Sequence, residues 1–402
     1  MTEKTKMAGV MSWTEGMSTE TDDGVPVAGE RATMSTLPRE QFMTRFRYAS
    51  SESLRNAYVT NHPLHVSHLS GVITSTLCED VFTLVNTQWN VLHEYLEASK
   101  MLGTDLGNSV LFDGLLSLFW NLRELHVEYR DTFLIDLERS CATANDFYRM
   151  METTEEFWAT LEQTYASLGG SGASVIHLKD QVNDLVALYT SDAVYAAQRA
   201  HTFVVREINQ SSIPSQLFSR DWEDVFTSNE VVLSIIKTME DYLYDFHNFL
   251  CNDLLYRKVV DSLIRAMVCF YITSLVRTAD QVRRRNQLKK KQTGFANPFR
   301  SLTRMMYDLE LFRSYFENLT KELPSLKPVV EEEMSVLVLV HECLGVAVTN
   351  TGDETSVEEF VIVMHKHTGG NMEVTRHFMG DLWFLAAPPT ERNEIFEIVA
   401  LM

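Results

Sequence analysis

Three closely spaced histidines are the first residues in this chain whose type and spacing could bind a metal ion. His62, His65 and His68 step by three, so they would share one face if the segment were helical. Pro63 breaks such a helix at its start, and no cysteine or carboxylate flanks the three imidazoles. We therefore predict that these histidines are structural or solvated and that none of them is a metal ligand.

Other catalytic and cofactor-binding patterns are absent from the sequence. Helical di-metal carboxylate sites use Glu-x-x-His, because residues three apart share a helix face, and none of the 12 histidines has Glu three positions before it. There is also no H-E-x-x-H, no P-loop and no G-x-S-x-G. We predict a non-enzymatic chain with no catalytic residues, no cofactor and no metal, and an all-α enzyme is the disfavoured alternative.

The clearest charge feature is a basic island between residues 255 and 315. It holds 13 Lys and Arg against 4 Asp and Glu, whereas the rest of the chain holds 22 against 51. Six cations lie within nine residues at its centre, and we call them the basic cluster: Arg283, Arg284, Arg285, Lys289, Lys290 and Lys291. We predict that this cluster binds a partner or an anionic surface, and that salt weakens the binding by screening.

The residues alone leave four interpretations of the basic cluster open. It could be a solvated loop or frayed helix end, or it could bind an acidic protein partner. It could lie on an anionic membrane leaflet, where each basic residue is worth ~1 kcal/mol. It could also be a nuclear-import signal.

The composition is that of an acidic protein with sizeable cores. The 402 residues carry a net charge of −20, which argues against a general nucleic-acid binder, and 45% of them are hydrophobic. The five scattered cysteines predict reduced, buried thiols in a cytosolic protein. We expect no signal peptide and no membrane span, because the first residues lack an apolar core and no run reaches ~18 consecutive apolar residues.

Helical spacing of apolar residues continues from about residue 52 nearly to the end of the chain. Steps of three and four place one apolar stripe on each helix, as in the series Val81, Val85, Trp89, Leu92 and Leu96. The run Val336 to Val340 could be a strand, but it lies between acidic residues without a turn signal, so we predict a buried helix. Seventeen Gly and nine Pro are also few for a β-sandwich or barrel.

The predicted fold class is all-α, an elongated rod of consecutive antiparallel helical bundles. Residues 1–50 are expected to be a disordered leader, because residues 1–40 are rich in Thr, Ser, Gly and acid and contain one Leu and one Trp. A first bundle region is expected over 51–210, and a second bundle over 211–348 with a basic linker at 283–300. A C-terminal bundle is expected over 349–402, where Ser356 and Glu359 form a capping-box pattern.

One part of the sequence resembles a known family. The segments that carry the resemblance are Leu217 to Trp222, Ile236 to Phe246, Arg265 to Ile272, and Arg304 to Phe316 beyond the basic linker. Their order is similar to that of the C-terminal part of exocyst complex component 3, the Sec-six subunit of the exocyst. The resemblance covers about residues 215–402 and rests on hydrophobic and aromatic positions that mark packing.

The resemblance implies a rod of helical bundles like those of other multisubunit tethers. It also implies a role in tethering secretory vesicles to the plasma membrane before fusion, through contacts with other exocyst subunits and SNARE proteins. The family has no catalytic activity or cofactor. The chain would then be cytoplasmic and peripheral to the plasma membrane or to secretory vesicles.

Two further functions remain open on the sequence. The chain could be another helical tether or a nanotube-forming relative of the family. It could instead be a stand-alone helical membrane-surface or scaffold protein that uses the basic cluster to bind anionic lipid or an acidic partner.

Overall fold

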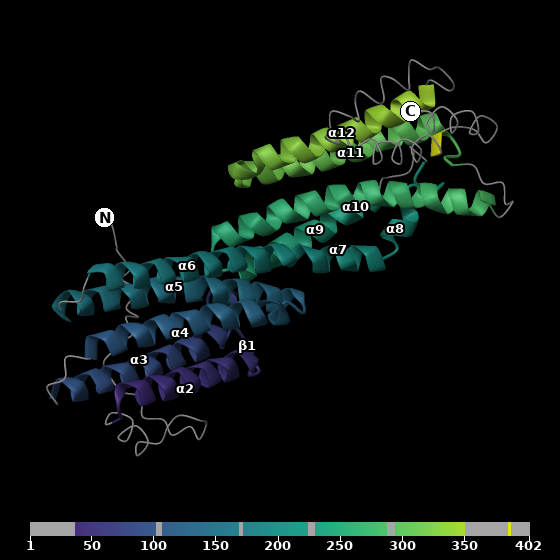
Figure 1. The fold of residues 1–402 in the computed structure, drawn as a ribbon. Coiled ribbons are helices and arrows are strands. Elements are labelled where there is room, and N and C mark those ends of the chain that lie inside the picture. The colour runs from purple at the N-terminus through teal and green to yellow at the C-terminus, as the bar shows by residue number, and fades with distance from the viewer. Residues whose placement is uncertain are drawn as a thin grey trace, which may run out of the picture.

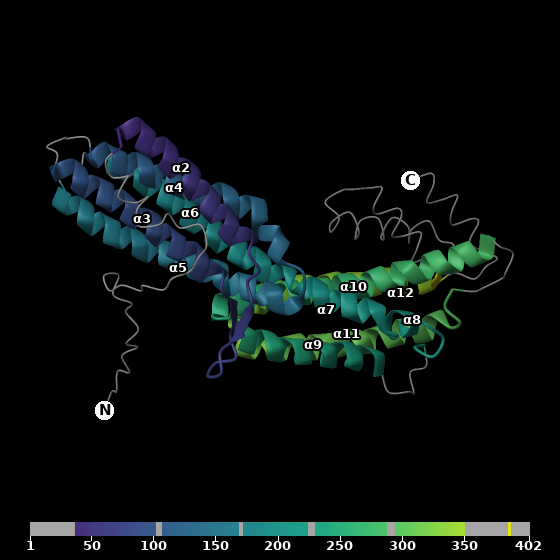
Figure 2. The same cartoon turned by 90° about the horizontal axis from the view of Figure 1, so that it is seen from below.

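The computed structural model describes residues 37–101, 107–168, 172–223, 230–287, 294–349 and 385–386. Nearly all of these residues are helical, and they form an elongated rod in which two groups of helices lie end to end (Figure 1). Seen from below, the two groups meet at a bend (Figure 2). The predicted all-α rod of consecutive bundles is therefore confirmed.

The first group of helices comes from the N-terminal half of the chain. It contains α2 (Arg39–Val59), α3 (Leu77–Met101), α4 (Gly107–Tyr129), α5 (Leu137–Leu168) and α6 (Gly172–Arg199), with a short 3-10 turn at Arg130–Phe133. Helices α5 and α6 run side by side along most of their length (Figure 1). The apolar stripes of the helices in this group face one core. Val81, Val85, Leu92 and Leu96 of the predicted series lie on α3 and are buried in that core.

The second group contains the longest described helix. It is built from α7 (His201–Gln210), α8 (Ile213–Gln216), α9 (Glu230–Phe249), α10 (Asp253–Gln287), α11 (Pro298–Glu322) and α12 (Lys327–Thr349). Helix α10, 35 residues long, packs against α6, α7, α9 and α12, so it joins this group to the first. Val336 to Val340 lie inside α12, which confirms their assignment to a helix.

A small β-hairpin was not predicted from the sequence. Strands β1 (Leu64–Val66) and β2 (Ile73–Ser75) pair antiparallel, with Val66 opposite Ile73. Gly71 in the connecting turn has a φ of +77°, which a residue without a Cβ adopts readily. Three-residue strands are too short for a period-two pattern to stand out in the sequence.

The predicted end of the leader at residue 50 is wrong. Helix α2 begins at Arg39, and its residues Phe42 and Phe46 are fully buried. The Phe42 ring stacks on Tyr95 of α3 with 3.8 Å between ring centroids. The polar composition was dominated by residues 1–36, which lie outside the described residues, and it concealed this amphipathic helix.

Helix α10 is the one helix among the described residues that is long and apolar enough, over Asp253–Val282, to cross a membrane. This is a statement about length and composition only, and a core helix meets the same test. Of the most apolar window of this helix, a share of 56% is buried inside the protein. The densest apolar run of the sequence, Ala266 to Ile272, lies in this helix, and it is far shorter than the ~18 consecutive apolar residues on which the expectation of no membrane span was based.

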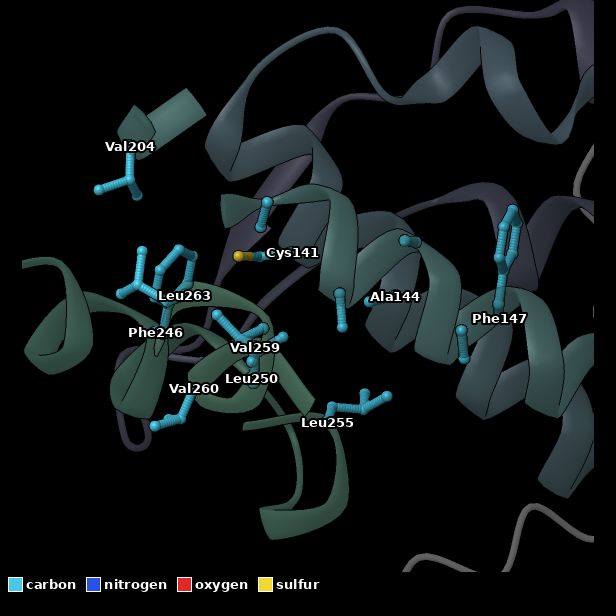
Figure 3. Close-up of a cluster of buried hydrophobic side chains, with 14 of the residues drawn as sticks. Cys141, Ala144, Phe147, Val204, Phe246, Leu250, Leu255, Val259, Val260 and Leu263 are labelled. Carbon is cyan, nitrogen blue, oxygen red and sulfur yellow. The ribbon is translucent and has the colours of Figure 1, made fainter. Parts of the chain in front are cut away.

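The two groups of helices meet at a tightly packed joint. Cys141 and Ala144 of α5 face apolar residues from the second group in Figure 3, namely Val204, Phe246, Leu250, Leu255, Val259, Val260 and Leu263. All of these side chains are buried. The joint is therefore a continuous hydrophobic core and not a flexible linker.

Asn145 ties the joint together with hydrogen bonds. Its Nδ2 donates to the carbonyl oxygens of Ile73, at 2.6 Å, and Phe249, at 2.7 Å. Its Oδ1 accepts from the backbone N–H of Cys251 at 2.9 Å. One buried amide thus fixes the hairpin and the turn between α9 and α10 onto α5.

The neighbouring carboxylate, Asp146, is buried and holds β2. It accepts hydrogen bonds from the backbone N–H of Ser75, at 3.0 Å, and from the Ser75 hydroxyl. Burial raises the pKa of Asp146 to about 7 from its ordinary value of 3.8, although the bonds from Ser75 oppose the rise. A raised pKa in the folded state means that this group contributes stability at low pH and loses that contribution as the pH rises towards 7.

Replacing Asp146 by asparagine is expected to remove this pH dependence. The free energy of unfolding of the unmodified chain, relative to Asp146→Asn, should be about 2 kcal/mol larger at pH 5 than at pH 8. Urea unfolding of both proteins at the two pH values measures the difference. An equal difference at both pH values would contradict the raised pKa.

Candidate partner-binding surface

The basic cluster begins at the end of α10, far from the joint. Arg283, Arg284 and Arg285 lie in the last turns of this helix, at the outer end of the rod (Figure 1). The Arg284 side chain is exposed. Lys289, Lys290 and Lys291 lie outside the described residues, so the structure does not test the six residues as a binding site.

Several other cations of the basic island are already paired. Arg265 on α10 forms ion pairs with Asp261, at 2.9 Å, with Glu332, at 3.1 Å, and with Glu333, at 3.0 Å. Arg313 pairs with Glu310 on α11 at 2.6 Å. Carboxylates therefore offset the charge of Arg265 and Arg313, and we place the candidate surface at the cluster.

The residues behind the family resemblance meet at a buried polar node. Asp308 of α11 accepts hydrogen bonds from Trp222 Nε1, at 2.9 Å, and from the Tyr271 hydroxyl, at 2.8 Å. Arg304 Nε lies 3.7 Å from the other carboxylate oxygen. Burial raises the pKa of Asp308 to about 6, against the opposing effect of its hydrogen bonds and of Arg304. These residues hold α10 and α11 together, so their role is in packing the helices.

The node also fixes the last residues of the basic linker. Glu223, next to Trp222, accepts the backbone N–H groups of Ala296 at 2.8 Å and Asn297 at 2.9 Å. The Asn297 side chain in turn accepts the N–H of Arg300 and caps α11. Both flanks of the basic linker are therefore anchored, at α10 and at the start of α11.

Gly294 lies where a distant part of the chain returns to this segment. The N–H of Phe295 donates to the carbonyl oxygen of Leu385 at 2.9 Å, and Leu385 and Ala386 are buried. A Cβ on Gly294 would lie 2.3 Å from that oxygen and 2.7 Å from the Leu385 Cα. The close approach of two backbones requires glycine at this position.

Replacing Gly294 by alanine should displace Leu385. We expect hydrogen exchange at the Phe295 amide to be at least tenfold faster, because the amide loses its acceptor. Gly345→Ala is the matched control, since its Cβ would meet nothing closer than 3.8 Å. Unchanged exchange in Gly294→Ala would show that the backbone relaxes without breaking the contact.

A buried cluster in the first group of helices was not identified from the sequence. His126 Nε2 lies 2.9 Å from Asp192, and Arg130 contacts the same carboxylate at 2.7 Å. Burial lowers the pKa of His126, so the ring is neutral, and the rings of Phe147 and Tyr189 pack against it. His126 is fully buried and Asp192 nearly so, and the cluster packs α4 against α6.

The early histidines are separated in the structure. His62 is buried and its Nδ1 lies 3.0 Å from Asp80, whereas His65 is in β1 and is exposed, as is His68. Among the residues that the structure describes, no group of three or more His, Cys, Asp or Glu could hold a metal ion. His62 therefore has a buried, structural position and His65 and His68 are exposed to solvent, whereas the absence of a metal from these histidines stays a prediction.

The helices form an all-α rod of serial helical bundles. Among solved structures it is similar to the crystal structure of the C-terminal domain of the exocyst subunit Sec6p, with a TM-score of 0.58 and 11% sequence identity. The similarity covers 93% of this chain and 89% of that one. No family model matches the chain, and no curated protein matches its sequence. At this identity the similarity establishes the fold.

Proposed function

We propose that the chain is a non-catalytic subunit of a vesicle-tethering assembly that resembles the exocyst, and that it helps to dock secretory vesicles at the plasma membrane. The observation that supports the proposal is the structural similarity to an exocyst subunit domain over 93% of the chain. Because one fold can serve several functions, the proposal has to be tested through binding partners.

The proposed partners are other exocyst subunits and SNARE proteins, and the proposed location is the cytoplasm, peripheral to the plasma membrane or to secretory vesicles. A helical rod suits this role, because helices extend by ~1.5 Å per residue and a packed joint keeps their ends apart. Charged faces at the surface then select partners and steer association.

Affinity purification of the tagged full-length chain from its native cells, followed by mass spectrometry, tests the proposal. We expect the other exocyst subunits in amounts comparable to the bait. A bait that is folded by circular dichroism and recovers none of them would contradict the tethering role.

Charge reversal of the arginines in the basic cluster tests the proposed docking surface. The variant Arg283→Glu, Arg284→Glu and Arg285→Glu is expected to lose the recovered partners while its helicity is unchanged. Reversal of three exposed cations elsewhere, Arg45, Arg47 and Lys237, changes the net charge equally and should leave recovery intact. Equal recovery with both variants would remove the cluster from the docking surface.

A second candidate function is a membrane-surface or scaffold protein that binds anionic lipid or an acidic partner through the basic cluster. The exposure of Arg284 at the outer end of the rod favours it. Flotation with vesicles that contain or lack anionic lipid separates the two functions. A membrane-surface protein should float only with vesicles that contain anionic lipid. A tethering subunit that contacts proteins alone should float with neither kind of vesicle.

A further inference from the structure

A groove near the joint end of the second group of helices has a chemical character opposite to that of the basic cluster. It lies between α9, the start of α10 and the end of α11, and its volume is about 590 Å³. Three carboxylates line it, one from each helix: Glu240, Asp253 and Glu322. Three tyrosines, also one from each helix, line it with them: Tyr244, Tyr256 and Tyr315.

The carboxylates of this acidic tyrosine groove have no cationic partners in the described structure. None of Glu240, Asp253 and Glu322 forms an ion pair with a described residue, and no Lys or Arg is among the described lining residues. Lys321 lies at the rim, where its Nζ donates to Asn318 Oδ1 at 2.8 Å. Three like charges around one opening repel one another, so a cation between them would be favoured.

Tyr315 shows that the charged groups converge on the groove. Its hydroxyl is buried without a hydrogen-bond partner among the described residues. Burial raises its pKa, and the nearby Glu240, Tyr256 and Glu322 raise it further. Residues from three helices therefore act electrostatically on one hydroxyl, and the oxygen of that hydroxyl is available to accept a hydrogen bond from a cationic N–H group.

The tyrosines supply the remaining part of a cation site. The Tyr244 ring is 72% exposed, and the Tyr256 ring packs against His247 at 5.2 Å between centroids. Aromatic faces attract cations and cover the aliphatic stems of long basic side chains. Arginine fits such a setting best, because its planar guanidinium both stacks on rings and donates to carboxylates.

We propose that the acidic tyrosine groove binds an arginine-bearing segment of a partner protein, with the guanidinium held by Glu240, Asp253 and Glu322 and its stem packed on the tyrosine rings. The inference does not rest on the tethering role. It concerns a different surface, and it is tested with the chain alone, so either proposal can fail without the other.

Fluorescence polarisation with labelled octaarginine and the full-length chain in ~150 mM salt tests the proposal. Octacitrulline is the matched probe, since it has nearly the same size and shape but no charge. We expect octaarginine to bind and octacitrulline to bind at least tenfold more weakly. Equal binding of the two peptides would overturn the proposal.

Two matched variants distinguish the groove from the general negative charge of the chain. The groove variant carries Glu240→Gln, Asp253→Asn and Glu322→Gln. The control variant carries Glu40→Gln, Glu52→Gln and Glu94→Gln, at exposed positions of α2 and α3. We expect the groove variant to bind octaarginine roughly tenfold more weakly and the control variant less than twofold more weakly. Equal losses would show that binding is non-specific.

A single exposed substitution keeps the test independent of folding. Tyr244→Ala removes a ring that is mostly in solvent, so the helical circular dichroism spectrum should not change. Loss of its contact with the guanidinium should weaken octaarginine binding about threefold. Unchanged affinity in both Tyr244→Ala and the groove variant would place the cation elsewhere.

Discussion

Replacing Asn145 by alanine is expected to lower the free energy of unfolding by about 3 kcal/mol. The substitution leaves three backbone groups without partners at the joint, the carbonyls of Ile73 and Phe249 and the N–H of Cys251. Each buried group that loses its partner costs about 1 kcal/mol or more. The effect is large because one side chain serves the hairpin, the end of α9 and the turn into α10.

Urea unfolding followed by circular dichroism measures this effect, and hydrogen exchange at the Cys251 amide localises it. Asn56→Ala is the matched control, since Asn56 is exposed on α2 and should change stability by less than about 0.5 kcal/mol. We also expect faster hydrogen exchange at the Cys251 amide in Asn145→Ala and not in Asn56→Ala. A loss below about 1 kcal/mol would mean that other groups replace the Asn145 amide.

Replacing Asp308 by leucine should lower the free energy of unfolding by about 4 kcal/mol. The change removes the acceptor of both the Trp222 and Tyr271 hydrogen bonds and leaves the buried Arg304 without its nearby carboxylate. Removing one partner from a buried charged network is far more costly than removing an exposed one.

Two other variants make this result specific to the node. Asp308→Asn keeps an oxygen acceptor and should lose only about 1 kcal/mol. Asp241→Leu makes the same change at an exposed position of α9 and should have an effect of less than about 0.5 kcal/mol. Similar losses for Asp308→Leu and Asp241→Leu would mean that the node does not stabilise the contact between α10 and α11.

Sequence patterns predicted the helices well, because helical spacing is a local property. The series that contains Val81 and Leu92, and the run around Leu337, each carry enough apolar residues to identify a helix without tertiary contacts. The start of α2 was missed because the segment around Phe42 follows a long polar stretch. The hairpin was missed because its position depends on Asn145, which lies 72 residues beyond Ile73.

The polar clusters could not be predicted, because each joins residues that are distant in the sequence. Trp222 and Asp308 are 86 residues apart, and His126 and Asp192 are 66 apart. The acidic tyrosine groove depends on three helices in the same way. Its one sequence signal is the acidic and aromatic content of the segment from Ile236 to Phe246, which the family resemblance assigned to packing. The basic cluster could be identified from the sequence alone, because its six cations lie within nine residues.

The unbroken course of α10 sets a fixed distance between two surfaces of opposite charge. Asp253 of the groove and Arg284 of the basic cluster lie on this one helix, 31 positions apart, which corresponds to about 47 Å. A bivalent partner that engages both surfaces needs a spacer of at least about 14 extended residues between its arginine-bearing and acidic segments. A spacer that spans this distance makes the second contact intramolecular and increases avidity, whereas a shorter one limits the partner to a single contact. If both surfaces bind as proposed, helix α10 would select bivalent partners by the distance between their charged segments.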